Sequence, residues 1–249
     1  MRPLLSYDEI FISPHLDDAA LSCGGQIAQA TRRGAKVLIV TLFTADAPEG
    51  ELSPLAAELH GIWGGGANPF PLRREEDRRS CAILGADCEH WGFPDAIYRR
   101  QGERWLYASR RGIFGRPDAA DETLQADLER RLSALAGLAV RGPMAIGGHV
   151  DHRLVRAALE AARLPGLELY EDFPYARSLK LRLLARGFSF DWKSRALPLS
   201  AEDLEIKTAA IGAFASQLGP AFAAGHDLGA EIERFARARG GERLYSRRR

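Results

Sequence analysis

Two short stretches of the sequence concentrate side chains that can do chemistry. Ser13–Asp18 reads SPHLDD, and Gly147–His152 reads GGHVDH. Between them they supply imidazole and carboxylate groups but no thiol. Nitrogen and oxygen donors of this kind bind zinc and ferrous iron in proteins. The two stretches together therefore predict a site for a divalent metal.

We predict that the metal ligands are His15, Asp18 and His152. Two imidazoles and one carboxylate form a mixed set, and catalytic zinc sites with three protein ligands leave a fourth position for water. Ferrous iron accepts the same donors, so Zn²⁺ is the first expectation and Fe²⁺ or another divalent metal is the alternative. The first stretch alone could equally be a helix cap beside a hydrogen-bonded histidine. Because the second stretch supplies further imidazole and carboxylate groups, a metal site is the preferred interpretation of the two stretches together.

Three neighbours of these ligands are candidate catalytic groups. Asp17 is adjacent to a ligand in sequence and could accept a proton from the attacking water. His149 could polarise a substrate oxygen or protonate a leaving amine. Asp151 could orient His149, although it also occupies a natural N-cap position for the next helix.

The segments around the first stretch predict how it is positioned. Glu9–Ser13 is an apolar run bounded by polar residues, which suits a buried strand. A helix is expected from Asp17 or Asp18 to about Arg33, where Gly34 is a stop signal. Lys36–Phe43 then predicts a second strand. A strand, a helix and a strand form a βαβ unit, for which a right-handed parallel crossover is the default.

The rest of the chain continues this alternation of strands and helices. Further strands are expected at Glu89–Phe93, Met144–Gly148, Leu167–Glu171 and Ser194–Leu199. Further helices are expected at Pro54–His60, Leu72–Leu84, Asp121–Leu138, Asp151–Arg163, Leu179–Arg186 and Ala201–Ser216. The pattern predicts one α/β domain over residues 1–249, Rossmann-like, with a mostly parallel sheet and helices on both faces. Its core would span about 8–176 and a C-terminal elaboration about 177–249. Parallel sheets bind ligands at the carboxyl ends of their strands, so both stretches are expected to meet in one cleft.

The chain resembles the LmbE/PIG-L family of metal-dependent, zinc-containing N-acetylglucosaminyl de-N-acetylases. The resemblance rests on Pro14–Asp18 and His149–His152 as a pair, which is more specific than either motif alone. Weaker similarity comes from Arg73–Glu76, Trp91–Asp95 and Tyr170–Ala176, in a compatible order from about residue 10 to 176. Two positions depart from the family pattern: Leu16 stands where proline is typical, and Ala19 where many members have glutamate.

The resemblance implies a reaction and a role for each site residue. It implies a Rossmann-like fold, with zinc held by His15, Asp18 and His152. Asp17 would be the general base, and His149 the group that stabilises the transition state or acts as the general acid. Arg73 and Asp95 match positions implicated in sugar binding. The implied reaction hydrolyses the N-acetyl group of an N-acetylamino-sugar conjugate and releases acetate and a free amine.

The amino-acid composition of the chain limits the kinds of molecule that it is expected to bind. Of 249 residues, 46% are hydrophobic and 27% charged, which is ordinary for a globular protein. Lys and Arg total 34 against 33 Asp and Glu, and this balance argues against broad electrostatic capture of nucleic acid. Three cysteines are too few for a disulfide framework, and no apolar segment is long enough to span a bilayer. We expect a cytoplasmic enzyme for a small amino-sugar substrate, with its oligomeric state left open.

Other functions remain as alternatives at this point. The same chemistry could serve an amidase that acts on a larger thiol or antibiotic conjugate. A non-catalytic carbohydrate-binding protein of the same fold would keep the cleft without turnover. A nucleotide-binding Rossmann protein is disfavoured, because the first strand is followed by His15–Asp18 rather than by a GxGxxG loop.

Overall fold

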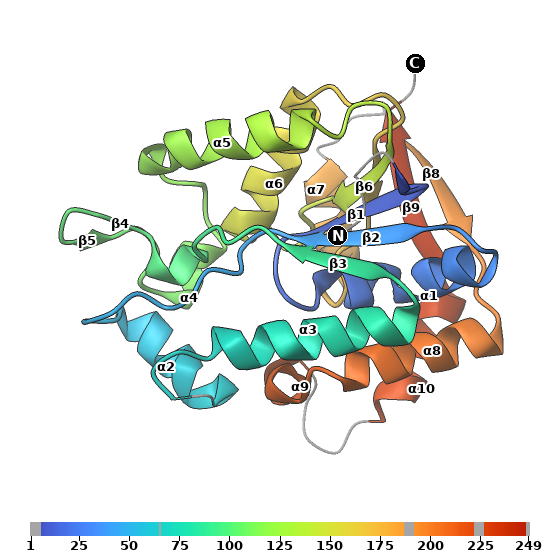
Figure 1. The fold of residues 1–249 in the computed structure, drawn as a ribbon, viewed down its shortest axis with the longest axis horizontal. Helices are drawn as coiled ribbons and strands as arrows, with labels where there is room; N and C mark the ends of the chain where they lie inside the picture. The colour runs from blue at the N-terminus through green and yellow to red at the C-terminus, as the bar shows by residue number, and fades with distance from the viewer. Residues whose placement is uncertain (1–5, 65, 187–191, 222–226, 248–249) are drawn as a thin grey trace.

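A computed structural model describes residues 6–64, 66–186, 192–221 and 227–247. These residues form a seven-stranded sheet covered by helices on both faces, and a separate two-stranded hairpin (Figure 1). The strands are β1 (Glu9–Ser13), β2 (Val37–Thr41), β3 (Asp87–His90), β4 (Arg100–Gln101), β5 (Arg104–Trp105), β6 (Ala139–Pro143), β7 (Glu168–Tyr170), β8 (Trp192–Leu197) and β9 (Glu242–Arg247). The helices are α1 (Asp18–Arg32), α2 (Pro54–Trp63), α3 (Phe70–Leu84), α4 (Arg110–Ile113), α5 (Glu122–Ser133), α6 (Val150–Ala161), α7 (Leu179–Arg186), α8 (Ala201–Gly212), α9 (Ala215–Ala221) and α10 (Leu228–Arg239). Within the described ranges, no helix is long and apolar enough to cross a membrane.

The sheet confirms the predicted α/β class. Its strand order is β3-β2-β1-β6-β7-β9-β8, and the first five of these strands are parallel. Side chains of β1 alternate between two cores, as expected for a strand buried on both faces. Ile10 and Ile12 pack in the cluster that contains α5 and α6, whereas Phe11 packs in the cluster that contains α1, α3 and α8.

The order of the strands creates the cleft. From β1 the chain passes to β2 and β3 on one side, and it later returns to the other side of β1 to form β6. Ligands of open α/β sheets bind at such a switch point, beyond the carboxyl ends of the strands. The first sequence motif follows β1 and the second follows β6, so the fold delivers both to this point.

The strand predicted at Met144–Gly148 was wrong, because β6 ends at Pro143. The three residues Ala145, Gly147 and Gly148 have φ values of 58°, 96° and 77°, which a strand does not allow. Ile146 is nevertheless fully buried, which explains why the run resembles a buried strand. The segment is instead a tight turn that leads from β6 into α6.

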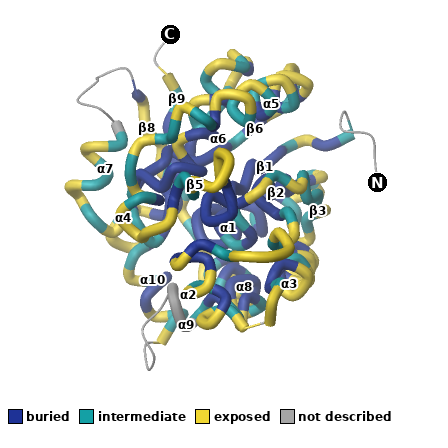
Figure 2. Tube along the Cα trace, turned by 90° about the vertical axis from the view of Figure 1, so that its left-hand side faces the viewer, coloured by how far each residue is buried: buried dark blue, intermediate teal, exposed yellow. Residues whose placement is uncertain are grey.

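The C-terminal elaboration packs against α1, the helix that carries Asp18. Helix α1 is buried along almost its whole length (Figure 2). A Cβ atom at Gly25 would lie 2.5 Å from a Leu199 methyl carbon, so glycine permits a close approach to the elaboration here. Glu242 of β9 accepts the backbone N–H groups of Gly25 and Gln26 at 3.0 and 2.8 Å. Strand β9, which the prediction missed, thus completes the sheet and holds α1 in place.

The long connection between β3 and α5 is more ordered than predicted. It contains a helical turn at Ala96–Tyr98, the hairpin β4–β5 and helix α4. Its buried residues join α2 in a third apolar cluster that also includes Leu16 and Val150, one from each motif. This segment therefore packs directly on the two loops that carry the candidate site.

Candidate metal centre

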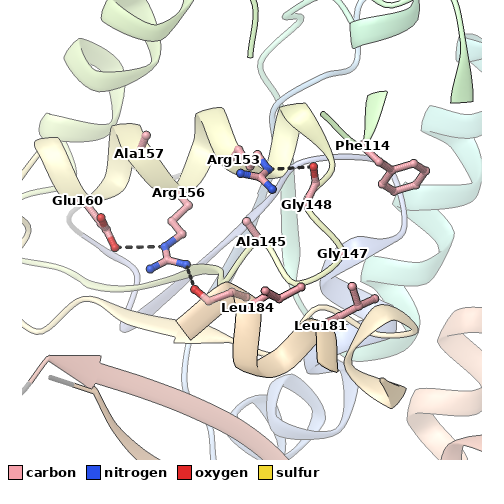
Figure 3. Close-up of a pocket in the computed structure, with 11 residues that line it drawn as sticks. Phe114, Ala145, Gly147, Gly148, Arg153, Arg156, Ala157, Glu160, Leu181 and Leu184 are labelled. Carbon is pink, nitrogen blue, oxygen red and sulfur yellow. Dashed lines mark hydrogen bonds and ion pairs between the residues drawn. The ribbon is translucent and has the colours of Figure 1, made fainter. Parts of the chain in front are cut away.

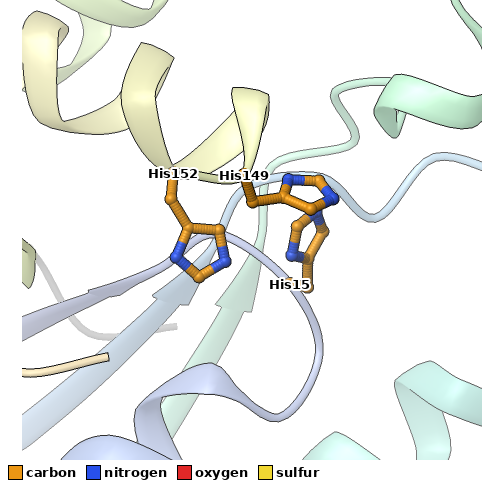
Figure 4. Close-up of side chains that lie close together, drawn as sticks. All are labelled: His15, His149 and His152. Carbon is orange, nitrogen blue, oxygen red and sulfur yellow. The ribbon is translucent and has the colours of Figure 1, made fainter. Parts of the chain in front are cut away.

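The rings of His15 and His152 lie close together, with that of His149, where the loop after β1 meets the start of α6 (Figure 4), and the Asp18 carboxylate contacts both His15 and His152. Asp18 Oδ2 lies 3.3 Å from His15 Nδ1 and 3.2 Å from His152 Nε2. The same oxygen accepts the backbone N–H of His15 at 2.8 Å. One nitrogen of each ring thus converges on a single carboxylate, and this donor set fits a zinc or ferrous ion.

The outer nitrogen of each of these rings is paired with a second carboxylate. His15 Nε2 lies 2.9 Å from Asp151 Oδ2, and His152 Nδ1 lies 2.7 Å from Asp172 Oδ1. Metal-binding histidines usually make this contact, which fixes the ring and its tautomer. The pairing leaves His15 Nδ1 and His152 Nε2 directed at Asp18.

Two sets of described side chains have one potential ligand atom from each residue within 4.8 Å of the others, and the predicted set of His15, Asp18 and His152 is not one of the two. The two sets are His15 with His149 and His152, and His15 with Asp95 and Asp151. In the second set, Asp151 already accepts hydrogen bonds from Arg99 and from the Ala96 backbone N–H. In the first, His149 Nδ1 accepts a backbone N–H. Asp18 Oδ2 lies 3.3 Å from His15 Nδ1 and 3.2 Å from His152 Nε2, so Asp18 remains the predicted carboxylate ligand.

Asp17 lies at the N-cap position of α1, yet its side chain makes no capping hydrogen bond. Its φ of 147° is unusual for a residue other than glycine, and such strain often occurs at functional sites. Asp17 lines the cavity beside the three predicted ligands. Burial raises the pKa of Asp17 to about 7, and the neighbouring charge of Asp18 adds to this rise. A carboxyl group with this pKa can both accept and release a proton near neutral pH.

His149 caps α6, and its Nδ1 accepts the backbone N–H of Asp151 at 3.2 Å. The ring proton of the neutral form is therefore on Nε2. Burial and the charges of His15 and His152 together outweigh the effect of Asp151 and lower the pKa of His149 to about 3. A neutral imidazole with an Nε2–H group suits donation of a hydrogen bond better than protonation of an amine.

Asp151, which was predicted either to orient His149 or to cap the next helix, contacts the His149 ring through its backbone N–H. The Asp151 carboxylate binds His15, the Arg99 guanidinium at 2.6 Å and the Ala96 backbone N–H at 3.1 Å. Burial opposes its negative charge, but Arg99 and His15 outweigh burial and hold the pKa of Asp151 well below its usual range.

The metal-site residues share one cavity with the two predicted sugar-binding residues. The cavity has a volume of about 290 Å³ and is lined by His15, Asp17, Asp18, His149 and His152 together with Arg73 and Asp95. Arg73 is only 3% exposed, and its guanidinium lies 4.4 Å from the centre of the Trp63 ring. Its buried Nε has no hydrogen-bond partner in the described part of the chain. An unpaired buried donor is costly, so this position suits a polar group of a ligand.

The sequence patterns did not identify several residues of the candidate site. Asp172 lies within the Tyr170–Ala176 similarity but was given no role of its own, although its place just after β7 was a signal for a site role. Gln217 of α9 lines the cavity from the C-terminal elaboration, and no local pattern marks it. Phe114 lies between this cavity and a second one of about 510 Å³, which Arg153 and Leu184 also line (Figure 3).

Metal affinity is expected to rise with pH. Burial lowers the pKa of His152, but Asp18 and Asp172 outweigh it and raise the pKa to about 10 in the metal-free protein. The pKa of His15 is also raised, mainly by Asp151 and Asp18 against the effect of burial. Because a metal must displace these protons, the association constant should increase about tenfold per pH unit for each proton displaced. Chelator competition between pH 6 and 8 measures this slope, and a flat profile would contradict the ligand assignment.

The sequence and the fold of the chain are similar to those of known deacetylases. The family model for PIG-L, described as GlcNAc-PI de-N-acetylase, matches residues 10–163, which include both motifs. The 2'-N-acetylparomamine deacetylase of Streptomyces fradiae is 37% identical over 67% of this chain, and the match spans 57% of that protein. The Niallia circulans protein of the same name is 30% identical over 80% of this chain and 84% of its own. The solved zinc-inhibited form of a teicoplanin deacetylase is 28% identical, with a TM-score of 0.77 over 96% of this chain and 98% of that one.

Proposed function

This chain belongs to the PIG-L family of de-N-acetylases, and from that premise we propose that it hydrolyses the N-acetyl group of an N-acetylamino-sugar conjugate. The products are acetate and a free amine. The observation that carries the proposal is the convergence of His15, Asp18 and His152 beside a carboxyl group with a pKa near 7. The chain acts as one domain over residues 1–249.

The metal we propose is zinc, held by His15 Nδ1, Asp18 and His152 Nε2. The donor set supports this choice, and a related deacetylase has been solved in a zinc-inhibited form. When bound, such an ion polarises the acetyl carbonyl and the attacking water.

The residues of the chain handle the proton and the developing charge. The Asp17 carboxylate accepts a proton from the water as the water oxygen forms a bond to the acetyl carbon. His149 donates a hydrogen bond from Nε2–H to the acetyl oxygen, which becomes negatively charged. Asp17, now protonated, gives its proton to the amine nitrogen as the C–N bond breaks. A pKa near 7 suits both steps.

Arg73 and Asp95 hold the sugar in this proposal. Arg73 lines the cavity and has a buried Nε–H without a partner in the described part of the chain, and Asp95 offers a carboxylate 3.7 Å from the His15 ring. At about 290 Å³ the cavity is at the lower end of ligand pockets. It accommodates a single amino-sugar residue, with the rest of the conjugate outside.

The test is acetate release from a panel of N-acetylglucosaminides and 2'-N-acetylparomamine. We expect equal amounts of acetate and free amine, loss of turnover with a chelator, and recovery with one equivalent of metal. Zinc should not exceed one equivalent, because a related enzyme has a zinc-inhibited form. Turnover of larger antibiotic conjugates alone would favour the amidase alternative. Sugar binding by the metal-loaded protein without acetate release would favour the non-catalytic alternative.

A further inference from the structure

A chain of buried polar side chains leads from His15 away from the cavity. His15 Nε2 lies 2.9 Å from Asp151 Oδ2, and Arg99 Nη1 donates to the other oxygen of Asp151 at 2.6 Å. Arg99 Nε lies 3.0 Å from Asp121 Oδ1, and the Tyr107 hydroxyl donates to Asp121 Oδ2 at 2.6 Å. The four residues behind His15 thus form a continuous series of contacts.

This network is almost completely removed from solvent. Asp151 is 0% exposed, Asp121 and Tyr107 are 3% exposed, and Arg99 is 5% exposed. Arg99 also lies over the rings of Phe43 and Tyr107, at 5.5 and 5.1 Å from their centres. Buried ion pairs are often no more stabilising than apolar residues of similar volume, so stability alone does not account for this one. Its contact with a metal ligand suggests a role in the site.

We infer that Arg99 is a positioning residue for the metal centre. Its guanidinium fixes one oxygen of Asp151, which leaves the other oxygen directed at His15 Nε2. That contact in turn holds His15 Nδ1 towards Asp18, which is the position of a metal ligand. Without Arg99, Asp151 Oδ1 loses this partner, and the carboxylate that orients the His15 ring is held by the Ala96 backbone N–H with less constraint.

Arg99 is itself in contact with two other residues of the segment between β3 and α5, Asp121 and Tyr107. Asp121 Oδ1 forms an ion pair with Arg99 Nε at 3.0 Å, and the Tyr107 hydroxyl donates a hydrogen bond to Asp121 Oδ2. The network therefore couples the packing of this segment to the geometry of a site on the far side of His15. The inference rests on the metal ligands given under the proposed function.

The test compares zinc affinity of the full chain with that of Arg99→Met and Arg99→Lys, measured by chelator competition. Loss of a group that orients a metal ligand typically weakens metal binding about 10- to 100-fold, and we expect this for Arg99→Met. Lysine should restore part of the affinity because it keeps the charge. The visible absorption spectrum of the Co²⁺-loaded protein should shift in the methionine variant, since the spectrum reports ligand geometry.

Arg104→Met is the matched control, because Arg104 pairs with Asp118 in the same segment and its side chain is 55% exposed. Its zinc affinity should equal that of the wild type. If Arg99→Met does not fold, Asp121→Asn should still weaken zinc binding. A lower melting temperature of Arg99→Met with unchanged zinc affinity and Co²⁺ spectrum would overturn the inference. Failure of the wild type to bind zinc would instead overturn the proposed metal site.

Discussion

Asp17→Asn is expected to lower kcat by about 10²- to 10⁴-fold, the usual contribution of a general base. Asparagine has nearly the same shape but cannot accept the proton of the attacking water. The fold should tolerate the change, because asparagine is among the residues most often found at positive φ and Asp17 makes no capping hydrogen bond. Metal content should remain at one equivalent. Steady-state acetate release, together with metal analysis, measures both quantities.

A matched control for this variant is Asp127→Asn, which removes an exposed carboxylate on α5 and should leave kcat unchanged. If Asp17→Asn keeps wild-type kcat at full metal occupancy, Asp17 is not the base. If the variant loses the metal instead, Asp17 is a ligand and the assignment of Asp18 needs revision.

His152→Ala is expected to weaken zinc binding by more than about 100-fold, because loss of a direct ligand should exceed the effect of losing an outer-shell partner. The substitution removes the nitrogen that faces Asp18 and leaves Asp172 without its 2.7 Å contact. Chelator competition at constant pH measures the affinity, and thermal unfolding shows whether the metal-free protein remains folded.

His90→Ala is the control for this prediction. His90 is also paired with a carboxylate, Asp77, at 2.8 Å, but it does not line the cavity. Its loss should leave zinc affinity unchanged. Equal zinc affinities of His152→Ala and the wild type would remove His152 from the ligand set.

Local patterns in the sequence were sufficient to predict the first half of the site. The apolar run of β1 is bounded by polar residues, and the motif that follows it lies at the carboxyl end of a strand by the rules of parallel sheets. The prediction of the mostly parallel α/β class was confirmed by the strand order. Periodicity and strand polarity are properties of short segments, so they can be recognised without long-range contacts.

Long-range pairing accounts for most of what was missed. Asp151 is two residues from His149, yet its carboxylate binds His15 and Arg99, which are 136 and 52 residues away in sequence. Strand β9 joins the sheet between β7 and β8, and its polar sequence does not resemble a buried strand. The turn after β6 was predicted as a strand because a buried segment is rich in apolar residues whether it forms a strand or a turn. Only the folded chain distinguishes these cases.

The most direct test of the account is a crystal structure of the zinc-loaded chain, with anomalous scattering recorded at the zinc absorption edge. The account predicts one strong peak within about 2.0–2.2 Å of His15 Nδ1, an Asp18 carboxylate oxygen and His152 Nε2. Asp17 and His149 should border the open side of that ion without binding it. A peak held by a different set of residues, or no peak between the loop after β1 and the start of α6, would contradict it.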